Sequence, residues 1–144
     1  MKVLLARPHD FVVVDMQRWV SALGYTPVRL SSVGELKEAV STELAAIVIS
    51  TAVSSSVKAT VGEVLDAARA AHPSVPIVIA SLSSLTSTQN GFRAELARHG
   101  LTLHACEEGA SWGQPNVALF VTPAELKPPR DELSSATARR HFRS

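Results

Sequence analysis

Residues 44–49 read Leu-Ala-Ala-Ile-Val-Ile, an unbroken apolar run that ends at Ser50. A short run of this kind, without alternating polar residues, predicts a strand that is buried on both faces, as in parallel sheets. A loop rich in serine and threonine, residues 50–56, follows directly. The run is therefore expected to form the central strand of a sheet, with a polar loop at its carboxyl end.

Short apolar stretches recur on both sides of this run and predict three further strands. They span residues 3–6, 26–30 and 77–80. The segments between them have the apolar spacing of helices, because apolar residues recur at intervals of three or four. Strands that alternate with helices in this way form right-handed βαβ units, so a parallel α/β sheet with helices on both faces is expected.

The predicted helices also carry end signals. Asp10 is expected to cap the first helix, which runs through an apolar stripe to Gly24. Residues 32–35 and 60–63 have the Ser/Thr-x-x-Glu pattern of a capping box, which indicates the starts of two more helices. A fourth helix is expected over residues 89–99.

Beyond Gly100 the pattern allows two interpretations. Residues 101–106 and 117–121 are equally good strands. Either the first is the fifth parallel strand and the second an extra edge strand, or the two form an appended hairpin. Residues 1–126 are assigned to one α/β domain, and residues 127–144 to a polar tail that forms a short helix or stays disordered.

Length and composition limit the classes of function. The chain has 144 residues and a net charge of +1, which fits one domain and favours no nucleic-acid partner. Its lone cysteine, Cys106, cannot form an intramolecular disulfide, which favours a reducing compartment. No apolar stretch approaches the roughly 20 residues of a membrane-spanning helix. A cytoplasmic protein without a membrane partner is therefore expected.

Several local strings resemble the receiver domain of bacterial response regulators. Residues 19–28, Trp-Val-Ser-Ala-Leu-Gly-Tyr-Thr-Pro-Val, look like that family's first helix leading into its second strand. Residues 31–39 look like the opening of its second helix, and residues 72–81, His-Pro-Ser-Val-Pro-Ile-Val-Ile-Ala-Ser, like the approach to its fourth strand. The resemblance covers residues 1 to 106. It implies a flavodoxin-like, doubly wound sheet of five parallel strands in the order 2-1-3-4-5, with residues 117–121 as the alternative extra edge strand.

The family's chemistry needs four kinds of residue. An acidic pair after strand one holds Mg²⁺, an aspartate ending strand three accepts phosphate, and a hydroxyl and a lysine ending strands four and five bind phosphoryl oxygens. A hard cation needs carboxylate oxygens, and a phosphoryl group needs the cation and an ammonium group. In this chain the corresponding residues are Arg7 and Pro8, Ser50, Ser81, and either Glu107 or Thr122.

This pattern predicts a degenerate pocket. Three of the four positions lack the required charge, so the resemblance implies a pseudo-receiver that is not phosphorylated on aspartate, is not an enzyme and needs no cofactor or metal. Arg7 is expected to plug the pocket by donating to carbonyls at the strand ends, or else to bind an anion there. The five histidines show no metal-ligand spacing.

The expected function is protein–protein interaction in bacterial signalling, with another regulatory protein or a second copy of the chain as partner. The family docks partners on the face made by its fourth helix, fifth strand and fifth helix. The candidate interaction residues on this face are Phe92, His104 and Trp112. The alternative function is a small-ligand or anion-binding domain that uses the crevice at the strand ends, although no glycine-rich phosphate loop supports it.

Overall fold

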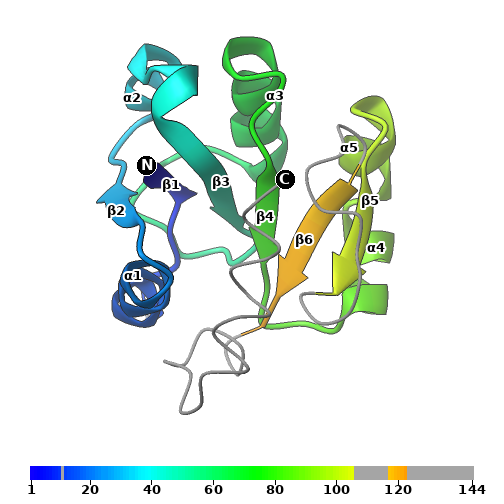
Figure 1. Ribbon diagram of the computed structural model, residues 1–144. Helices are drawn as coiled ribbons and strands as arrows, with labels where there is room; N and C mark the ends of the chain where they lie inside the picture. The colour runs from blue at the N-terminus through cyan, green and yellow to red at the C-terminus, as the bar shows by residue number, and fades with distance from the viewer. Residues whose placement is uncertain (11, 106–116, 123–144) are drawn as a thin grey trace.

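The computed structural model describes residues 1–10, 12–105 and 117–122. Its strands form one parallel sheet of six strands in the order β2-β1-β3-β4-β6-β5 (Figure 1). The predicted α/β class and parallel sheet are therefore confirmed. The strands are β1 (Lys2–Arg7), β2 (Thr26–Arg29), β3 (Leu44–Ser50), β4 (Ile77–Ala80), β5 (Thr102–Ala105) and β6 (Val117–Val121).

Helices pack on both faces of this sheet and divide the core in two. Because successive strand residues point to opposite faces, Val3 and Leu5 of β1 pack with α1, while Leu4 and Ala6 pack with α2, α3 and α5. No described helix is long and apolar enough to cross a membrane. The helices are α1 (Val13–Ala22), α2 (Val33–Glu38), the 3-10 turn η1 (Ser41–Glu43), α3 (Val61–Ala71), α4 (Leu85–Gly91) and α5 (Arg93–Arg98).

The fifth position of the sheet belongs to β6, not to β5. In Figure 1 the orange β6 lies between β4 and β5, and it pairs in parallel with both. The predicted extra edge strand at 117–121 is therefore wrong, as is the hairpin alternative. All five residues of β6 are apolar and buried, whereas Thr102 and His104 of β5 are polar and exposed. A strand with one polar face belongs at an edge. The alternation of polar and apolar residues over 102–105 therefore distinguishes β5 from β6 in the sequence.

The helix starts differ in how well the sequence predicts them. Both predicted N-caps are confirmed: Glu35 N donates to Ser32 Oγ over 3.3 Å, and Glu63 N donates to Thr60 Oγ1 over 3.1 Å. The return bonds of a full capping box do not form, because Glu35 Oε1 accepts from Ser31 N and Glu63 Oε1 from Thr60 Oγ1. The predicted cap at Asp10 is wrong, because α1 begins after Val12 and has no side-chain cap.

The predicted helix 89–99 is two short helices. Phe92 stands between α4 and α5 with φ −121° and ψ 27°, so the helical backbone breaks there. The first helix also starts earlier than predicted, because Ser84 Oγ accepts a hydrogen bond from Ser87 N over 3.1 Å and so caps it. The break at Phe92 and the cap at Ser84 therefore give two helices of about two turns each where the sequence predicted a single helix.

A buried histidine connects α2, η1 and α3. His72, at the C-terminal end of α3, is 1% exposed. Its Nε2 lies 2.7 Å from the Leu36 carbonyl oxygen, and its Nδ1 lies 2.5 Å from Ser41 Oγ. Because a carbonyl can only accept, Nε2 donates and Nδ1 accepts from the Ser41 hydroxyl. Both ring nitrogens are satisfied, which makes this histidine part of the structure and leaves it no role as a ligand.

A charged cluster connects α3 to α5. Asp66 Oδ1 accepts hydrogen bonds from His99 Nε2 over 2.6 Å and from Arg98 Nε over 3.1 Å. The hydrogen bond from His99, followed by the hydrogen bond and positive charge of Arg98, holds the pKa of Asp66 below its ordinary value. The cluster therefore favours the ionised form of this carboxylate in the folded state.

Replacement of Asp66 by asparagine is expected to make the stability less sensitive to acid. Because the folded-state pKa of Asp66 is lowered, its contribution is present above the unfolded-state value of about 3.9 and is lost as the pH falls through the folded-state value. The urea midpoint, measured from about pH 6 to about pH 2, should fall less steeply in Asp66→Asn than in the wild type. Equal slopes in the two proteins would contradict this role.

Candidate functional site at the carboxyl edge of the sheet

The candidate site lies where β1, β3, β4 and β6 end. The parallel order places Arg7, Ser50, Ser81 and Thr122 at or just beyond these four carboxyl ends. Ser50 pairs with Ala80 in the β3–β4 register, and Ser81 N donates to the Val121 carbonyl over 3.1 Å. The sequence-based alignment of these positions on one edge therefore agrees with the sheet.

Arg7 fills its position with hydrogen bonds to backbone carbonyls. Its Nε donates to the Ala59 oxygen over 2.9 Å, and its Nη1 donates to the Ser50 oxygen over 2.6 Å and also to the Ala52 oxygen. The side chain is 7% exposed, and burial lowers the pKa of this guanidinium from its ordinary value. Arginine remains charged in proteins, so a fixed positive charge sits among carbonyl dipoles here. This geometry matches the plug that the sequence suggested.

The bonds of Arg7 also fix the loop between β3 and α3. Ser50 and Ala52 stand at the start of the loop and Ala59 at its end, so one guanidinium joins both ends. The alanine carbonyls carry no sequence signal, because any residue supplies a carbonyl. Sequence reasoning could therefore suggest a plug but could not identify its partners.

The Ser50 hydroxyl takes part in the local turn. The residue is 2% exposed, and its Oγ accepts a hydrogen bond from Ala52 N over 3.1 Å. This is the backbone-satisfying arrangement that serine commonly adopts at a strand end. The hydroxyl therefore stabilises the turn into the loop, beside the guanidinium of Arg7.

Ser81 joins the neighbouring loop to β3 and α4. Its Oγ accepts from Thr51 Oγ1, from Thr88 Oγ1 and from Ser83 N, each over 3.0 Å. Thr88 is 3% exposed, so this group of hydroxyls is largely removed from water. Sequence analysis singled out Ser81 alone. The only sign of Thr88 in the sequence is that it is another hydroxyl residue, seven positions after Ser81.

Asp10 is the carboxylate nearest to these strand ends along the chain, and it is engaged elsewhere. Its Oδ2 accepts from Ser54 Oγ over 2.7 Å, and its Oδ1 lies 3.7 Å from Arg29 Nη2. Pro8 is buried immediately after β1. A single exposed carboxylate that already has a hydroxyl and a guanidinium as partners is a poor ligand set for Mg²⁺, which prefers several oxygens.

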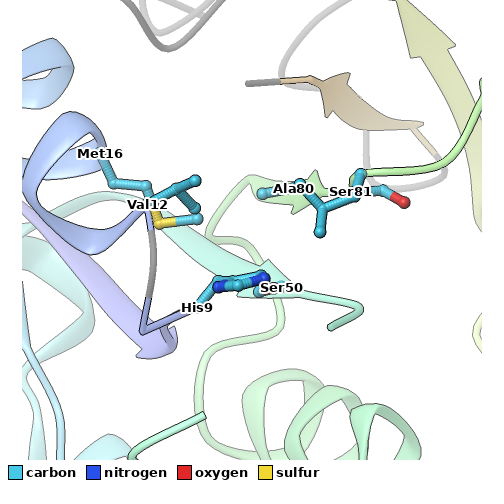
Figure 2. A pocket seen from close by; sticks show the side chains of 7 residues that line it. His9, Val12, Met16, Ser50, Ala80 and Ser81 are labelled. Carbon is cyan, nitrogen blue, oxygen red and sulfur yellow. The ribbon is translucent and has the colours of Figure 1, made fainter. Parts of the chain in front are cut away.

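A small hollow lies between α1 and the ends of β3 and β4. Its empty volume is about 190 Å³. Figure 2 shows the His9 ring beside Ser50, with Val12 and Met16 on one side and Ala80 and Ser81 on the other. The side made by Val12 and Met16 is therefore apolar, whereas the opposite side carries both Ala80 and the polar Ser81. The lining residues are His9, Val12, Met16, Ser50, Ala80, Ser81 and Leu82.

The remaining candidate residues lie in different places. Since β6 takes the fifth position, Thr122 is the residue that corresponds to the family's lysine, and Glu107 lies outside the described residues. Phe92 is half-buried and packs against the core, and His104 is exposed on the edge strand β5. Trp112 lies outside the described residues. Neither Phe92 nor His104 is among the residues at the strand-end site.

Neither a metal cluster nor a carboxylate pair is found at this edge in the part of the chain that the structure describes. There, no group of three or more His, Cys, Asp or Glu side chains could hold a metal ion. The groups that face one another are a guanidinium, hydroxyls, an imidazole and backbone carbonyls. This set can hold loops in place by hydrogen bonding, but it offers no ligand cage for a divalent cation.

Comparison with known proteins identifies the fold. No protein-family model and no curated protein match the chain. The solved structure of NtrX from Brucella abortus, a response regulator, matches with a TM-score of 0.60 at 11% sequence identity. The match covers 99% of this chain and 26% of that one, so this chain spans about a quarter of NtrX. At this identity the likeness shows a receiver-like fold alone.

Proposed function

We propose that this chain is a receiver-like signalling module that acts by binding proteins and does not accept phosphate on the residue ending β3. Arg7 carries the proposal: a fixed guanidinium stands where the resemblance implies metal-binding acids. It already donates to the carbonyls of Ser50, Ala52 and Ala59. A divalent cation placed beside this charge would be repelled, because like charges in a partly buried site interact strongly.

The hydroxyl positions support the same proposal. Ser50 Oγ is engaged in its own turn, and Ser81 Oγ is engaged with Thr51 and Thr88. Aspartyl phosphate needs a carboxylate nucleophile, which serine does not provide, and the described residues at the strand ends contain no acid–base pair for another reaction. We therefore propose a non-enzymatic role, with another regulatory protein or a second copy as partner.

The size of the strand-end hollow counts against the small-ligand alternative. Small-molecule pockets usually enclose roughly 300 to 1,000 Å³, whereas the centre of a water molecule has only about 10 Å³ available inside this hollow. Arg7 is the cationic side chain at these strand ends, and its Nε and Nη1 already donate to backbone carbonyls. No specific observation favours a bound nucleotide or anion.

Beryllofluoride with Mg²⁺, a mimic of the phosphoryl group, tests the proposal. Added to the full chain, it is expected to leave the amide NMR spectrum unchanged, because the site has neither the carboxylate nor the cation ligands that the complex needs. Shifts clustered at Ser50 and Ser81 would overturn the proposal.

The variant Ser50→Asp distinguishes a site that lacks only the phosphate-accepting carboxylate from a site in which Arg7 also excludes the cation. Ser50→Asp restores the carboxylate but keeps Arg7, so it should also give no shifts with beryllofluoride and Mg²⁺. A response in Ser50→Asp comparable to that of an active receiver, run as the positive control, would show that Arg7 does not exclude the cation. That result would remove the observation on which the proposal rests.

A further inference from the structure

The strand β2 forms one edge of the sheet, and its outer side has no partner strand among the described residues (Figure 1). An open edge presents unpaired N–H and C=O groups, which can pair with a strand of another chain. The segments on both sides of β2, residues 12–25 and 30–43, are described in full. The hydrogen bonding of each backbone amide along this edge is therefore defined.

The backbone of β2 alternates between β1 and the open side. The amides of Thr26 and Leu30 each donate over 3.1 Å to a carbonyl oxygen in β1 or just before it, so these two residues face β1. In a parallel pair the N–H and C=O of one residue bond to the same neighbouring strand, and the next residue along the chain turns the other way. Pro27 and Arg29 therefore direct their backbone groups to the open side.

Three amides of this open side are removed in different ways. Pro27 has no N–H. Tyr25, the next residue of the alternation on one side, donates its amide to the Val20 oxygen near the end of α1 over 3.2 Å. Ser31, the next residue on the other side, donates its amide to Glu35 Oε1 over 2.9 Å. A strand added along residues 25–31 would therefore find a single amide, that of residue 29.

The bond between Glu35 and Ser31 is not needed to cap α2. In a full capping box the carboxylate would accept from the amide of the N-cap residue, Ser32, but it accepts from the residue before it. The cap itself is made by Glu35 N, which donates to Ser32 Oγ over 3.3 Å. The side chain of Arg29 adds an exposed charge to the same edge. Proline and charge are the means by which natural edge strands avoid pairing.

We propose that Pro27 and the Glu35–Ser31 hydrogen bond close the β2 edge to strand addition, so that neither a second copy nor an extended peptide of another protein binds there by lengthening the sheet. Strand addition draws its affinity from main-chain hydrogen bonds, and an edge with one available amide supplies too few. This goes beyond the interaction role proposed above, because it excludes one mode of binding at one of the two sheet edges.

A double variant, Pro27→Val with Glu35→Ala, restores two of the missing donors. The amides of residues 27, 29 and 31 then form a continuous outward row. We expect the full chain to associate through β2, with an association constant at least about tenfold above the wild-type value or its upper limit. Sedimentation equilibrium from about 10 µM to about 1 mM measures this constant. Amide hydrogen exchange at residues 27 and 29 should slow as the concentration rises.

Thr26→Val is the matched control. It places valine on the same strand, but the amide of residue 26 already donates to the Met1 oxygen, so no outward donor is added. Its association and its amide exchange should equal those of the wild type. Pro27→Val alone restores one donor and leaves the Ser31 amide bonded to Glu35, so its association constant should lie between those of the wild type and the double variant.

Wild-type association in both Pro27→Val and the double variant, with wild-type circular dichroism, would overturn the proposal. Equal association in Thr26→Val would also overturn it, as would association without slower exchange at residues 27 and 29. If the double variant does not fold, Pro27→Val alone decides the question. The beryllofluoride test does not involve this edge, so failure of the closed edge and failure of the pseudo-receiver role are distinguishable.

Discussion

Replacing Arg7 with alanine is expected to lower the free energy of unfolding by about 3 to 5 kcal/mol, since hydrogen bonds from a charged donor stabilise by roughly 1.5 to 3 kcal/mol each and partly buried carbonyls would be left unpaired. The three carbonyls concerned belong to Ser50, Ala52 and Ala59. Urea unfolding followed by circular dichroism measures the change. Because the loss falls on one loop, the slope of free energy against urea should stay the same.

Arg29→Ala is the control for this experiment. Arg29 is also an arginine on this edge, but its side chain is 43% exposed and its partner Asp10 lies 3.7 Å away. An exposed ion pair of this kind contributes at most about 1 kcal/mol. If the two variants lost the same stability, Arg7 would not be the anchor of the loop. Arg7→Lys should lie between wild type and Arg7→Ala, because an ammonium group keeps the charge but lacks the planar fork that spans the carbonyls.

His72→Ala is expected to cost about 3 to 4 kcal/mol, since it both opens a cavity and leaves a buried carbonyl unpaired. The ring is 1% exposed and fills the space where α2, η1 and the end of α3 meet. Its loss removes the donor of the Leu36 carbonyl and the acceptor of the Ser41 hydroxyl. Denaturant unfolding measures the loss, and hydrogen exchange should increase first around Leu36 and Ser41.

His104→Ala is the matched change on the surface. His104 is exposed on β5, with Nε2 3.3 Å from Thr102 Oγ1. Surface substitutions of this kind usually change stability by no more than about 0.5 kcal/mol. A loss below about 1 kcal/mol for His72→Ala would mean that water or a neighbouring group replaces both of its partners.

The structural role of Arg7 limits which substitutions this position tolerates. A position that is free to vary would tolerate loss of its charge, whereas this guanidinium fixes the loop between β3 and α3. The same residue therefore anchors the loop and carries the proposed exclusion of a cation from the strand ends.

Most of the sheet could be predicted because its strands are buried on both faces. Residues 44–49 and 77–80 contain only apolar residues, and such runs leave few alternatives in an α/β pattern. The order of the last two strands could be misread, because both 101–106 and 117–121 are apolar enough for a strand. Their order follows from which one pairs with β4, and that pairing depends on packing between residues distant in sequence.

Helix-capping patterns in the sequence predicted the structure correctly only where the capping residue bonds to a neighbour in the chain. The N-caps at Ser32 and Thr60 formed as predicted, since each joins residues three apart. Asp10 looks like a cap in sequence, but Ser54 and Arg29 compete for its carboxylate from other parts of the chain. A helix-capping pattern cannot reveal such distant competitors.

The sequence by itself determined the class of fold and the types of side chain at the strand ends: Arg7, Ser50 and Ser81 stand there whatever their contacts. Only the tertiary structure decided what these residues do there. The partners of Arg7 are backbone carbonyls, and the side-chain partners of Ser81 are Thr51, just after β3, and Thr88 of α4. Side-chain type fixes charge and donors, whereas the partner is fixed by which backbone the fold brings within about 3 Å.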